Sequence, residues 1–354
     1  MGRQLLPFSP RDQVALGATS PPRRLDPLLQ KGFPVKVSII GMGAVGTEIV
    51  GNLINLTDIS EIVAVDRDRA KAEAEIWDFA HTTAFTYSKN PLLTVGDYPD
   101  TAGSDIVVVT AGTQLKAGQT RGDLVSANAV IVRNILAKVQ PYSPNAILIM
   151  VTNPVDVLAW VAVRHCGWPR ERVISAGTVI DSARFLRILS DHVGIDPKNI
   201  FGYVLGEHGS TSFIPWSICN VCGLDLDTYC EDNGITPVDR EQIHQQVLEA
   251  GFEIFRRKGN TNHGIAASVF RIIRAIETNE HSVLPVGALL DGEYQTRDVV
   301  ISVPCVVGRS GIERVLSYTL AAEELAEFRR SEGHLRELAA RAEAALAAAS
   351  APGN

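Results

Sequence analysis

The amino-acid sequence predicts an α/β fold, with a doubly wound parallel sheet in the first half of the chain and an α+β region in the second. Three patterns carry this prediction. Apolar runs of strand length alternate with helical patterns between residues 35 and 151. These runs lack polar alternation, which is typical of strands covered by helices on both faces. From about Ala183, helical patterns alternate instead with strands of period two or of mixed burial.

The first unit of the predicted sheet is a strand, a glycine-rich turn and a helix. Residues 35–40 are a β-branched run without a turn former, and residues 47–54 repeat their apolar positions at helical spacing. The turn between them reads Gly41-Met42-Gly43-Ala44-Val45-Gly46. Its glycines suit a tight turn, backbone close to a pyrophosphate and close helix-to-strand packing, and the helix start offers free N–H groups to the anion. This unit predicts a dinucleotide site.

The second predicted strand, residues 61–65, ends at Asp66. A carboxylate at this position accepts hydrogen bonds from the ribose hydroxyls of NAD and repels the 2′-phosphate of NADP. The sequence therefore favours NAD, while Arg67 and Arg69 leave NADP open. The plainer alternative is an ordinary βαβ unit whose aspartate is only solvated.

Two further apolar runs, residues 105–109 and 146–151, predict the fourth and fifth strands. The loops after the first and fourth strands flank the crevice where doubly wound sheets hold ligands. The loop after the fourth strand is rich in small residues and ends in Arg121, so it could close over the site as a lid. The loop after the fifth strand places Asn153 directly before a proline.

The second half predicts helices at residues 240–257 and 266–276, paired strands at 283–290 and 299–307, and an alanine-rich helix at 321–348. The opening residues lack sustained periodicity and are interpreted as an arm. The predicted organisation is a flexible N-terminal arm (1–34), a cofactor-binding domain (35–180), an α+β substrate and catalytic domain (181–348) and a tail (349–354).

Composition narrows the class of partner. The chain has 354 residues, a formal net charge of −7 and no basic tract, which argues against nucleic acid. It has no apolar run of about eighteen residues, so no membrane association is predicted. Five cysteines, an odd number, suggest reduced thiols in a cytoplasm. The lone Cys219-x-x-Cys222 pair is interpreted as packing, and no metal site is predicted.

An ordered series of motifs resembles the L-lactate and malate dehydrogenase family, closest to its lactate branch, over about residues 35–335. It comprises Gly41 to Gly46, Asp66, Thr110-Ala111-Gly112, Arg121, Asn153-Pro154, Asp181-Ser182-Ala183-Arg184, Gly206-Glu207-His208-Gly209 and Ser302-Val303-Pro304. The resemblance implies a Rossmann-type NAD domain, a small 2-oxo or 2-hydroxy acid as substrate, and a homo-oligomer, either a dimer or a tetramer.

The resemblance also implies roles for single residues. His208 would be the general acid and base, because an imidazole titrates near working pH. Asp181 would hold the second ring nitrogen of His208, although an aspartate before Ser-Ala-Arg could also be a helix N-cap. Arg184 would grip the substrate carboxylate with its planar fork. Arg121 would polarise the reacting carbonyl and Asn153 would donate to the same oxygen.

The remaining implied residues line the two ligands. Thr261 and Ile265 would face the substrate side chain and the nicotinamide, although residues 260–265 match the family loosely. The cofactor would contact Gly41, Met42, Gly43, Ala44, Val45, Gly46, Asp66, Tyr98, Thr110, Ala111, Gly112, Thr113, Val151 and Asn153.

Specificity is predicted from Leu115. The family position that meets the far end of the substrate is commonly Gln in lactate enzymes and Arg in malate enzymes, and here it is Leu115. A leucine cannot neutralise a second carboxylate, so the prediction is an L-lactate dehydrogenase-like enzyme for 2-oxo monocarboxylic acids. A one-residue shift of the loop would put Lys116 there and return malate dehydrogenase as a candidate. A non-catalytic NAD-binding scaffold is the other alternative, although no catalytic position is broken.

Overall fold

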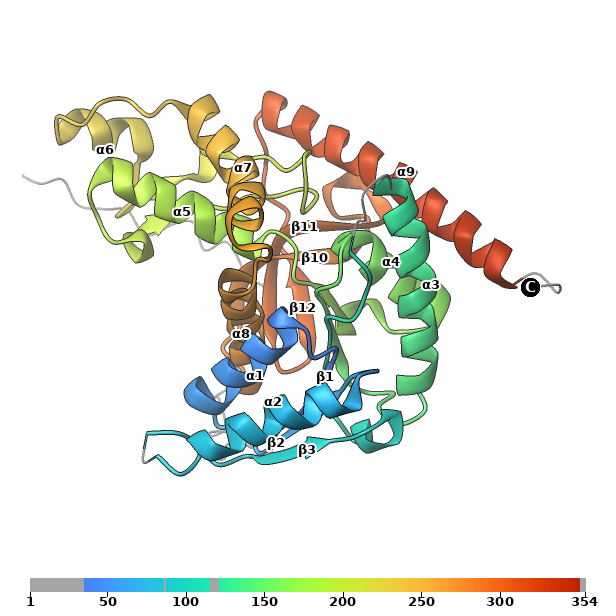
Figure 1. The fold of residues 1–354 in the computed structure, drawn as a ribbon. Coiled ribbons are helices and arrows are strands. Elements are labelled where there is room, and N and C mark those ends of the chain that lie inside the picture. The colour runs from blue at the N-terminus through green and yellow to red at the C-terminus, as the bar shows by residue number, and fades with distance from the viewer. Residues whose placement is uncertain (1–34, 86, 115–120, 351–354) are drawn as a thin grey trace, which may run out of the picture. The chain divides into compact units, whose positions relative to one another are not determined.

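The computed structural model describes residues 35–85, 87–114 and 121–350. Its main sheet has nine strands in the order β12-β11-β10-β6-β5-β4-β1-β2-β3 (Figure 1). Six of them run parallel and give the order 3-2-1-4-5-6 expected of a doubly wound sheet. They are β1 (Lys36–Ile40), β2 (Glu61–Val65), β3 (Leu92–Val95), β4 (Ile106–Val109), β5 (Ile147–Met150) and β6 (Val173–Ser175).

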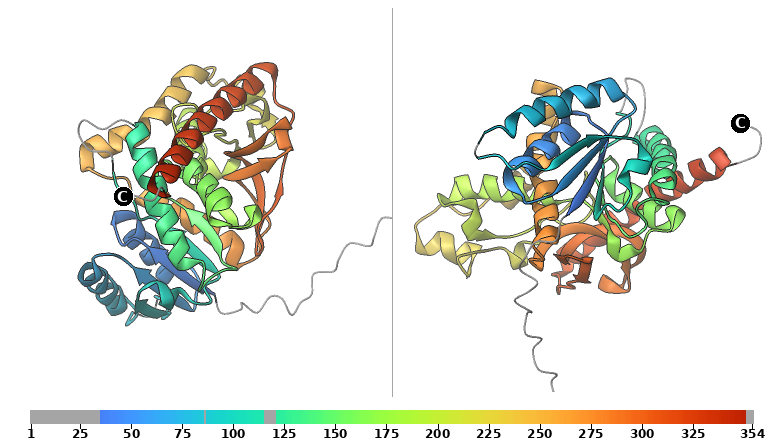
Figure 2. Two further views of the ribbon diagram at one scale, coloured as in Figure 1. Left: turned by 90° about the vertical axis from the view of Figure 1, so that its right-hand side faces the viewer. Right: turned by 90° about the horizontal axis from the view of Figure 1, so that it is seen from below.

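The central parallel strands are buried because helices cover both faces of the sheet, whereas the edge strand β3 is only partly buried. All four residues of β4 and of β5 are buried, as the unbroken apolar runs predicted. On one face α1 packs against α8, and on the other α3 and α4 pack against each other and against α9 (Figures 1 and 2). These helices are α1 (Ala44–Leu56), α3 (Arg121–Val139), α4 (Val155–Cys166), α8 (His263–Glu277) and α9 (Ala322–Ser350); α2 spans Arg69–Thr82.

The second half of the chain extends the same sheet. The predicted strand pair is confirmed as β10 (Ser282–Asp291) and β11 (Arg297–Gly308), which run antiparallel and are followed by β12 (Gly311–Val315). β10 also pairs with β6 through Gly287 and Ser175, so the two halves share one hydrogen-bonded sheet. A small second sheet contains β7 (Ile200–Phe201), β8 (Asn220–Val221) and β9 (Leu224–Asp225).

Helices α5 (Val179–Val193), α6 (Leu226–Asp232) and α7 (Arg240–Lys258) lie beside that second sheet and enclose a separate small core around Phe185. The expected helix at residues 240–257 is thus confirmed as α7. It begins at Arg240 and its N-cap is Asp239, whose carboxylate accepts a hydrogen bond from the Gln242 N–H. Within the described residues, no helix combines the length and the apolar character needed to cross a membrane.

Candidate active site

The carboxyl ends of β1 and β4 form a cradle of backbone. Gly41 has φ of +111°, and a Cβ added at Gly46 would lie 1.9 Å from the Gly41 carbonyl oxygen. Only glycine permits this close approach of helix and strand. Helix α1 follows with Gly43 as its N-cap, which supplies no side-chain hydrogen bond, and Gly43 and Ala44 are exposed. The first amides of α1 therefore face open space in the manner of a phosphate site.

Asp66 is held in position at the end of β2. Its Oδ2 accepts a hydrogen bond of 2.6 Å from the Met42 N–H, and its Oδ1 accepts one of 2.8 Å from the Asp68 N–H. These bonds fix the carboxylate beside the glycine turn. A fixed negative charge there suits ribose hydroxyls and opposes a 2′-phosphate, so the cradle fits NAD.

A buried amide ties together the loops after β4 and β5. Asn128 of α3 is fully buried; its Oδ1 accepts from the Thr113 N–H at 2.8 Å, and its Nδ2 donates to the carbonyl oxygens of Thr113 and Asn153 at 3.1 and 2.7 Å. Thr110 also donates from Oγ1 to the Gly41 carbonyl at 2.7 Å. Sequence reasoning missed Asn128, and the only signal was an amide among the apolar positions of a helix.

The other residues expected at the cofactor surround this cradle. Val45, Ala111 and Val151 are partly buried against the core, and Asn153 is exposed and joined to Pro154 by a cis peptide bond. Tyr98 begins a short 3₁₀ helix (Tyr98–Thr101) and lies under the ammonium of Lys138, 5.1 Å from the ring centre. A Cβ at Gly112 would collide with Thr152 at 2.3 Å, so this loop also depends on a glycine.

His208 and Asp181 are in direct contact on the substrate side of the cradle. Nδ1 of His208 lies 2.6 Å from Oδ2 of Asp181, whose Oδ1 accepts a 2.8 Å hydrogen bond from Nη1 of Arg184. Helix α5 begins at Val179 and its N-cap is Thr178, so the alternative interpretation of Asp181 as the N-cap is wrong. Asp181 stands instead in the first turn, three residues before Arg184, where both side chains project from one helical face.

Burial and charge shift the pKa values of this pair in opposite directions. Burial alone would lower the pKa of His208, but the charge and hydrogen bond of Asp181, with a smaller contribution from Asp156, raise it above its ordinary value. Burial would raise the pKa of Asp181, and the contacts with His208 and Arg184 outweigh that effect and lower it. The pair therefore favours an imidazolium beside a carboxylate, with Nδ1 committed to Asp181 and Nε2 left to act on a substrate.

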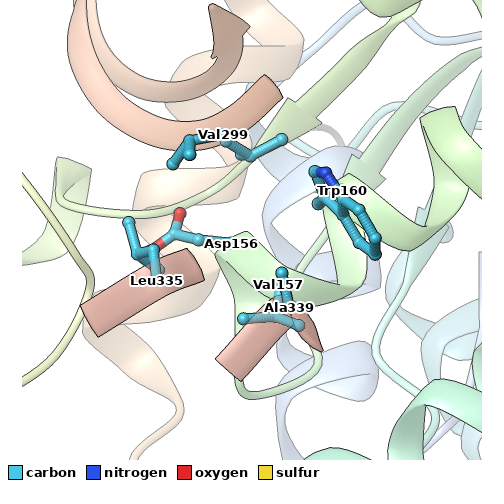
Figure 3. A pocket seen from close by; sticks show the side chains of 7 residues that line it. Asp156, Val157, Trp160, Val299, Leu335 and Ala339 are labelled. Atoms are coloured by element: carbon cyan, nitrogen blue, oxygen red, sulfur yellow. The ribbon is translucent and has the colours of Figure 1, made fainter. Parts of the chain in front are cut away.

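A second buried carboxylate, Asp156, holds the backbone of His208. Asp156 is 2% exposed; its Oδ2 accepts from the His208 N–H at 2.8 Å and its Oδ1 accepts from Ser175 Oγ at 2.6 Å. Burial raises the pKa of Asp156 to about 6. Figure 3 shows this carboxylate beside Leu335 of α9. Sequence reasoning gave Asp156 no role; an acid at the head of an otherwise apolar helix was the available signal.

Thr261 and Ile265 flank the start of α8, where both are half-buried. Between them, Nδ1 of His263 lies 3.0 Å from Oε1 of Glu48, and Nδ2 of Asn262 donates to Oε2 of Glu48 at 3.3 Å. The segment is thereby joined to α1, the helix that opens at the glycine turn.

Three expected residues are not placed at the site by their side chains. Leu115 and Lys116 lie outside the described residues. Arg121, expected at the end of the loop, is the first residue of α3, and its side chain is not among the described groups. Across the described part of the chain, no grouping of three or more His, Cys, Asp or Glu side chains suits a metal ion.

Two family models match consecutive parts of the chain and together cover nearly all of the described residues. Residues 35–175 match the NAD-binding domain of lactate/malate dehydrogenase, and residues 178–346 match the α/β C-terminal domain of the same family. The L-lactate dehydrogenase of Acetivibrio thermocellus is 41% identical over 305 residues, covering 86% of this chain and 96% of that protein. The L-lactate dehydrogenase of Moorella thermoacetica is 43% identical over 310 residues, covering 87% and 97%.

Solved structures agree with the sequence relatives. A lactate dehydrogenase from a Medee basin deep-sea metagenome library superposes with a TM-score of 0.84 at 34% identity, covering 88% of this chain and 99% of that one. The minor L-lactate dehydrogenase of Enterococcus mundtii gives 0.83 at 35% identity, covering 87% and 98%. The cradle, the His208–Asp181 pair and these matches together show that the chain belongs to the lactate/malate dehydrogenase family and is an NAD-dependent 2-hydroxy acid dehydrogenase.

Proposed function

We propose that this enzyme acts as an L-lactate dehydrogenase, interconverting a 2-oxo monocarboxylic acid and the corresponding L-2-hydroxy acid, with His208 as the general acid and base. One observation carries the proposal: Asp181 contacts His208 with one carboxylate oxygen and Arg184 with the other. Asp181 thus holds both a proton carrier, His208, and a guanidinium that can bind a carboxylate, Arg184. A 2-oxo acid presents the matching groups, a carbonyl beside a carboxylate.

In the reductive direction, NADH, when bound, would supply the hydride that forms the new C–H bond at the carbonyl carbon. His208 gives the proton on Nε2 to the carbonyl oxygen, which forms the O–H bond of the 2-hydroxy acid. Asp181 keeps the other proton on Nδ1 and stabilises the imidazolium before transfer. In the oxidative direction, neutral His208 takes the hydroxyl proton back.

Arg184 binds the carboxylate of the substrate. One guanidinium nitrogen, Nη1, is bound to Asp181 and the side chain is 18% exposed, which fixes the plane of the fork while leaving further donors for a ligand carboxylate. Arg121 polarises the carbonyl and Asn153 donates to the same oxygen. The Asn128 amide supports Asn153 by binding its backbone carbonyl. Thr261 and Ile265 contact the substrate side chain and the nicotinamide.

The cofactor contacts follow the cradle described above. The pyrophosphate is bound by backbone amides of Gly41 to Gly46, and the adenosine ribose by Asp66. Tyr98, Thr110, Ala111, Gly112, Thr113, Val151 and Asn153 line the remainder of the cofactor. The fixed orientation of Asp66 supports these assignments.

Substrate choice rests on Leu115. An apolar side chain accepts the methyl of pyruvate and gains about 0.8 kcal/mol for each further methylene that it buries. A second carboxylate in the same place would lose several kcal/mol of hydration without an opposite charge. The enzyme therefore prefers monocarboxylic 2-oxo acids, including ones longer than pyruvate.

A substrate panel tests this choice. NADH oxidation is followed with pyruvate, 2-oxobutyrate, 4-methyl-2-oxopentanoate, phenylpyruvate and oxaloacetate, with His208→Ala as the inactive control. Monocarboxylic acids are expected to be the faster substrates, and Leu115→Arg is expected to transfer preference to oxaloacetate. Faster turnover of oxaloacetate by the unaltered enzyme contradicts the proposal, and its loss on Lys116→Ala identifies the shifted loop and a malate dehydrogenase. NADH binding without turnover of any panel member supports the scaffold alternative.

Domain limits, assembly and location are part of the same proposal. The cofactor domain is taken as residues 35–180 and the substrate domain as 181–348. Large apolar side chains are exposed on α2 (Trp77, 64%) and on α7 (Phe252, 67%; Phe255, 52%), which supports a homo-oligomer, dimer or tetramer. All five cysteines are free thiols, which fits a reducing cytoplasm. Light scattering of the full chain tests assembly, and a monomer at assay concentration contradicts it.

A further inference from the structure

The carboxylate of Glu207, directly before His208, is enclosed by its own loop. Glu207 is 6% exposed, and its Oε2 accepts hydrogen bonds from Thr211, at 2.6 Å from Oγ1 and 3.2 Å from the backbone nitrogen. A Cβ added at Gly209 would lie 2.5 Å from Oε1 of Glu207, so the chain can wrap the carboxylate only with glycine there. The conformation of residues 206–211 thus depends on a buried charge.

Helix α9 supplies the remaining contacts of this loop. Ser331 Oγ accepts a 2.6 Å hydrogen bond from the Glu207 N–H and lies 3.2 Å from Thr211 Oγ1. His334, almost one turn further along α9, places Nε2 3.5 Å from Oε1 of Glu207. That nitrogen is buried and makes no hydrogen bond to the described residues. The 3.5 Å separation is long for a directed hydrogen bond, so Nε2 faces the carboxylate without being fully bonded to it.

Several other charges face this pair. Asp181 contacts the His208 ring, and Asp156 contacts its backbone nitrogen. The charge of Glu207 contributes to the raised pKa of Asp156, so the carboxylates interact. His244 of α7 binds the Ser212 carbonyl through Nε2, near Glu327 and Arg330 of α9. Two carboxylates therefore contact His208, and a third, Glu207, lies against His334.

The same stretch of α9 reaches Asp156. Leu335 and Ala339, which follow His334, line a small pocket with Asp156, Trp160 and Val299 (Figure 3). A displacement of this part of α9 would therefore disturb two buried carboxylates: Asp156, which holds the His208 backbone, and Glu207, which holds Thr211. α9 is anchored elsewhere by packing on α3 and α4.

We propose that His334 is a positioning residue for the catalytic histidine: its Nε2, set against the buried Glu207 carboxylate, fixes loop 206–211 and thereby the ring of His208. This rests on the proposed role of His208. Loss of this contact leaves the buried carboxylate without a facing donor. More negative potential then remains beside His208, which stabilises its imidazolium, and the loop is strained.

The central experiment compares His334→Leu with His334→Gln, which keeps a donor. His334→Leu is expected to move the alkaline limb of the kcat/KM profile for the 2-oxo acid to higher pH and to lower kcat about tenfold, because the buried carboxylate loses its facing donor. His334→Gln is expected to restore most of both values. The Kd of NADH, from fluorescence titration, is expected to stay unchanged. The double variant His334→Leu/Glu207→Gln is expected to return the limb towards its original pH, because the carboxylate charge is gone.

The matched control is His281→Asn, which removes a His–Glu pair with Glu313 (Nε2 to Oε2, 3.3 Å) near the far end of β11. Asn tolerates the positive φ of His281, and this variant is expected to leave the profile unchanged. Histidine NMR titration reads the His208 pKa without any turnover, so it distinguishes a failure of the present proposal from a failure of the proposed substrate. An unshifted His208 titration in folded His334→Leu, or an equal shift in folded His334→Gln, overturns the proposal.

Discussion

Two histidine–carboxylate contacts in this enzyme have similar lengths and very different surroundings. His208 and Asp181 are 2.6 Å apart with side chains 21% and 9% exposed, whereas His263 and Glu48 are 3.0 Å apart with side chains 71% and 33% exposed. The buried pair shifts the pKa values of both partners, because water no longer screens the charges. The exposed pair joins two helices at little electrostatic cost. Burial, more than distance, decides which pair performs chemistry.

The largest expected effect comes from neutralising the carboxylate of the buried pair. Asp181→Asn keeps the shape of the side chain but presents an amide to His208 and to Arg184, so the tautomer and the imidazolium lose their support. We expect kcat to fall by about 10⁴-fold, the loss typical of this substitution in histidine–aspartate sites. Steady-state NADH oxidation measures it.

The control for Asp181→Asn is Asp191→Asn on the same helix. Asp191 pairs with Arg187 across one turn, and both side chains are more than half exposed. This variant should retain nearly full activity. Equal losses in the two variants would mean that the fall reports damage to α5 and not the chemistry of the pair.

Asp156→Asn tests the carboxylate that holds the His208 backbone. The pKa of Asp156 is about 6 in the folded protein against an ordinary 3.8, so the folded state binds this proton more tightly than the unfolded state. Stability from this group is present below pH about 4 and is lost as pH rises to about 6, which amounts to about 3 kcal/mol. The free energy of unfolding of Asp156→Asn relative to the unaltered enzyme should therefore rise across this interval.

Urea unfolding at several pH values measures that difference. The asparagine retains an acceptor for the His208 N–H and a donor for Ser175 Oγ, so the fold has no reason to collapse. A stability difference that is flat between pH 4 and 6 would show that Asp156 titrates normally.

Gly251→Ala perturbs the second partner of Asp181. A Cβ at this position of α7 would lie 3.3 and 3.4 Å from the two terminal nitrogens of Arg184, so the guanidinium must shift by a few tenths of an ångström. We expect the KM for the 2-oxo acid to rise roughly fivefold, equivalent to about 1 kcal/mol, with the Kd of NADH unchanged. Gly333→Ala in α9, where a Cβ meets nothing within 4 Å, is the control and should stabilise the fold.

The smallest effect is expected at the exposed pair. Glu48→Gln keeps an acceptor for Asn262 and removes the charge facing His263. The free energy of unfolding should fall by less than about 1 kcal/mol, and high salt should abolish the difference. Thermal melts at two salt concentrations measure this. A loss comparable with that of a buried pair would show that burial is not what separates the two contacts.

Local patterns predicted the parts of the fold that depend on neighbours in sequence. The glycine turn, Asp66 and the β10–β11 pair were predicted because each depends on a short sequence pattern: spaced glycines, an acid at the end of a strand, or two apolar runs joined by a turn. Asn128, Asp156 and His334 were not found, because their importance comes from contacts with elements far along the chain: Asn128 reaches two loops, Asp156 reaches the His208 backbone, and His334 reaches Glu207. The alternative interpretation of Asp181 as the N-cap of α5 was wrong by three residues, since Thr178 and Asp181 are both acceptable caps from sequence.

The shared sheet sets a distance inside the active site. The glycine turn follows β1 directly. The His208 loop is bound to β11 by two backbone hydrogen bonds between Gly206 and Ser302, each 3.0 Å long. Between these points lie only hydrogen-bonded strands. The placement of His208 relative to the glycine turn therefore depends on strand register, and a slip of one residue anywhere between them would displace one from the other by about 3.3 Å along the strands. Catalysis therefore depends on the register of strands that themselves carry no catalytic side chain.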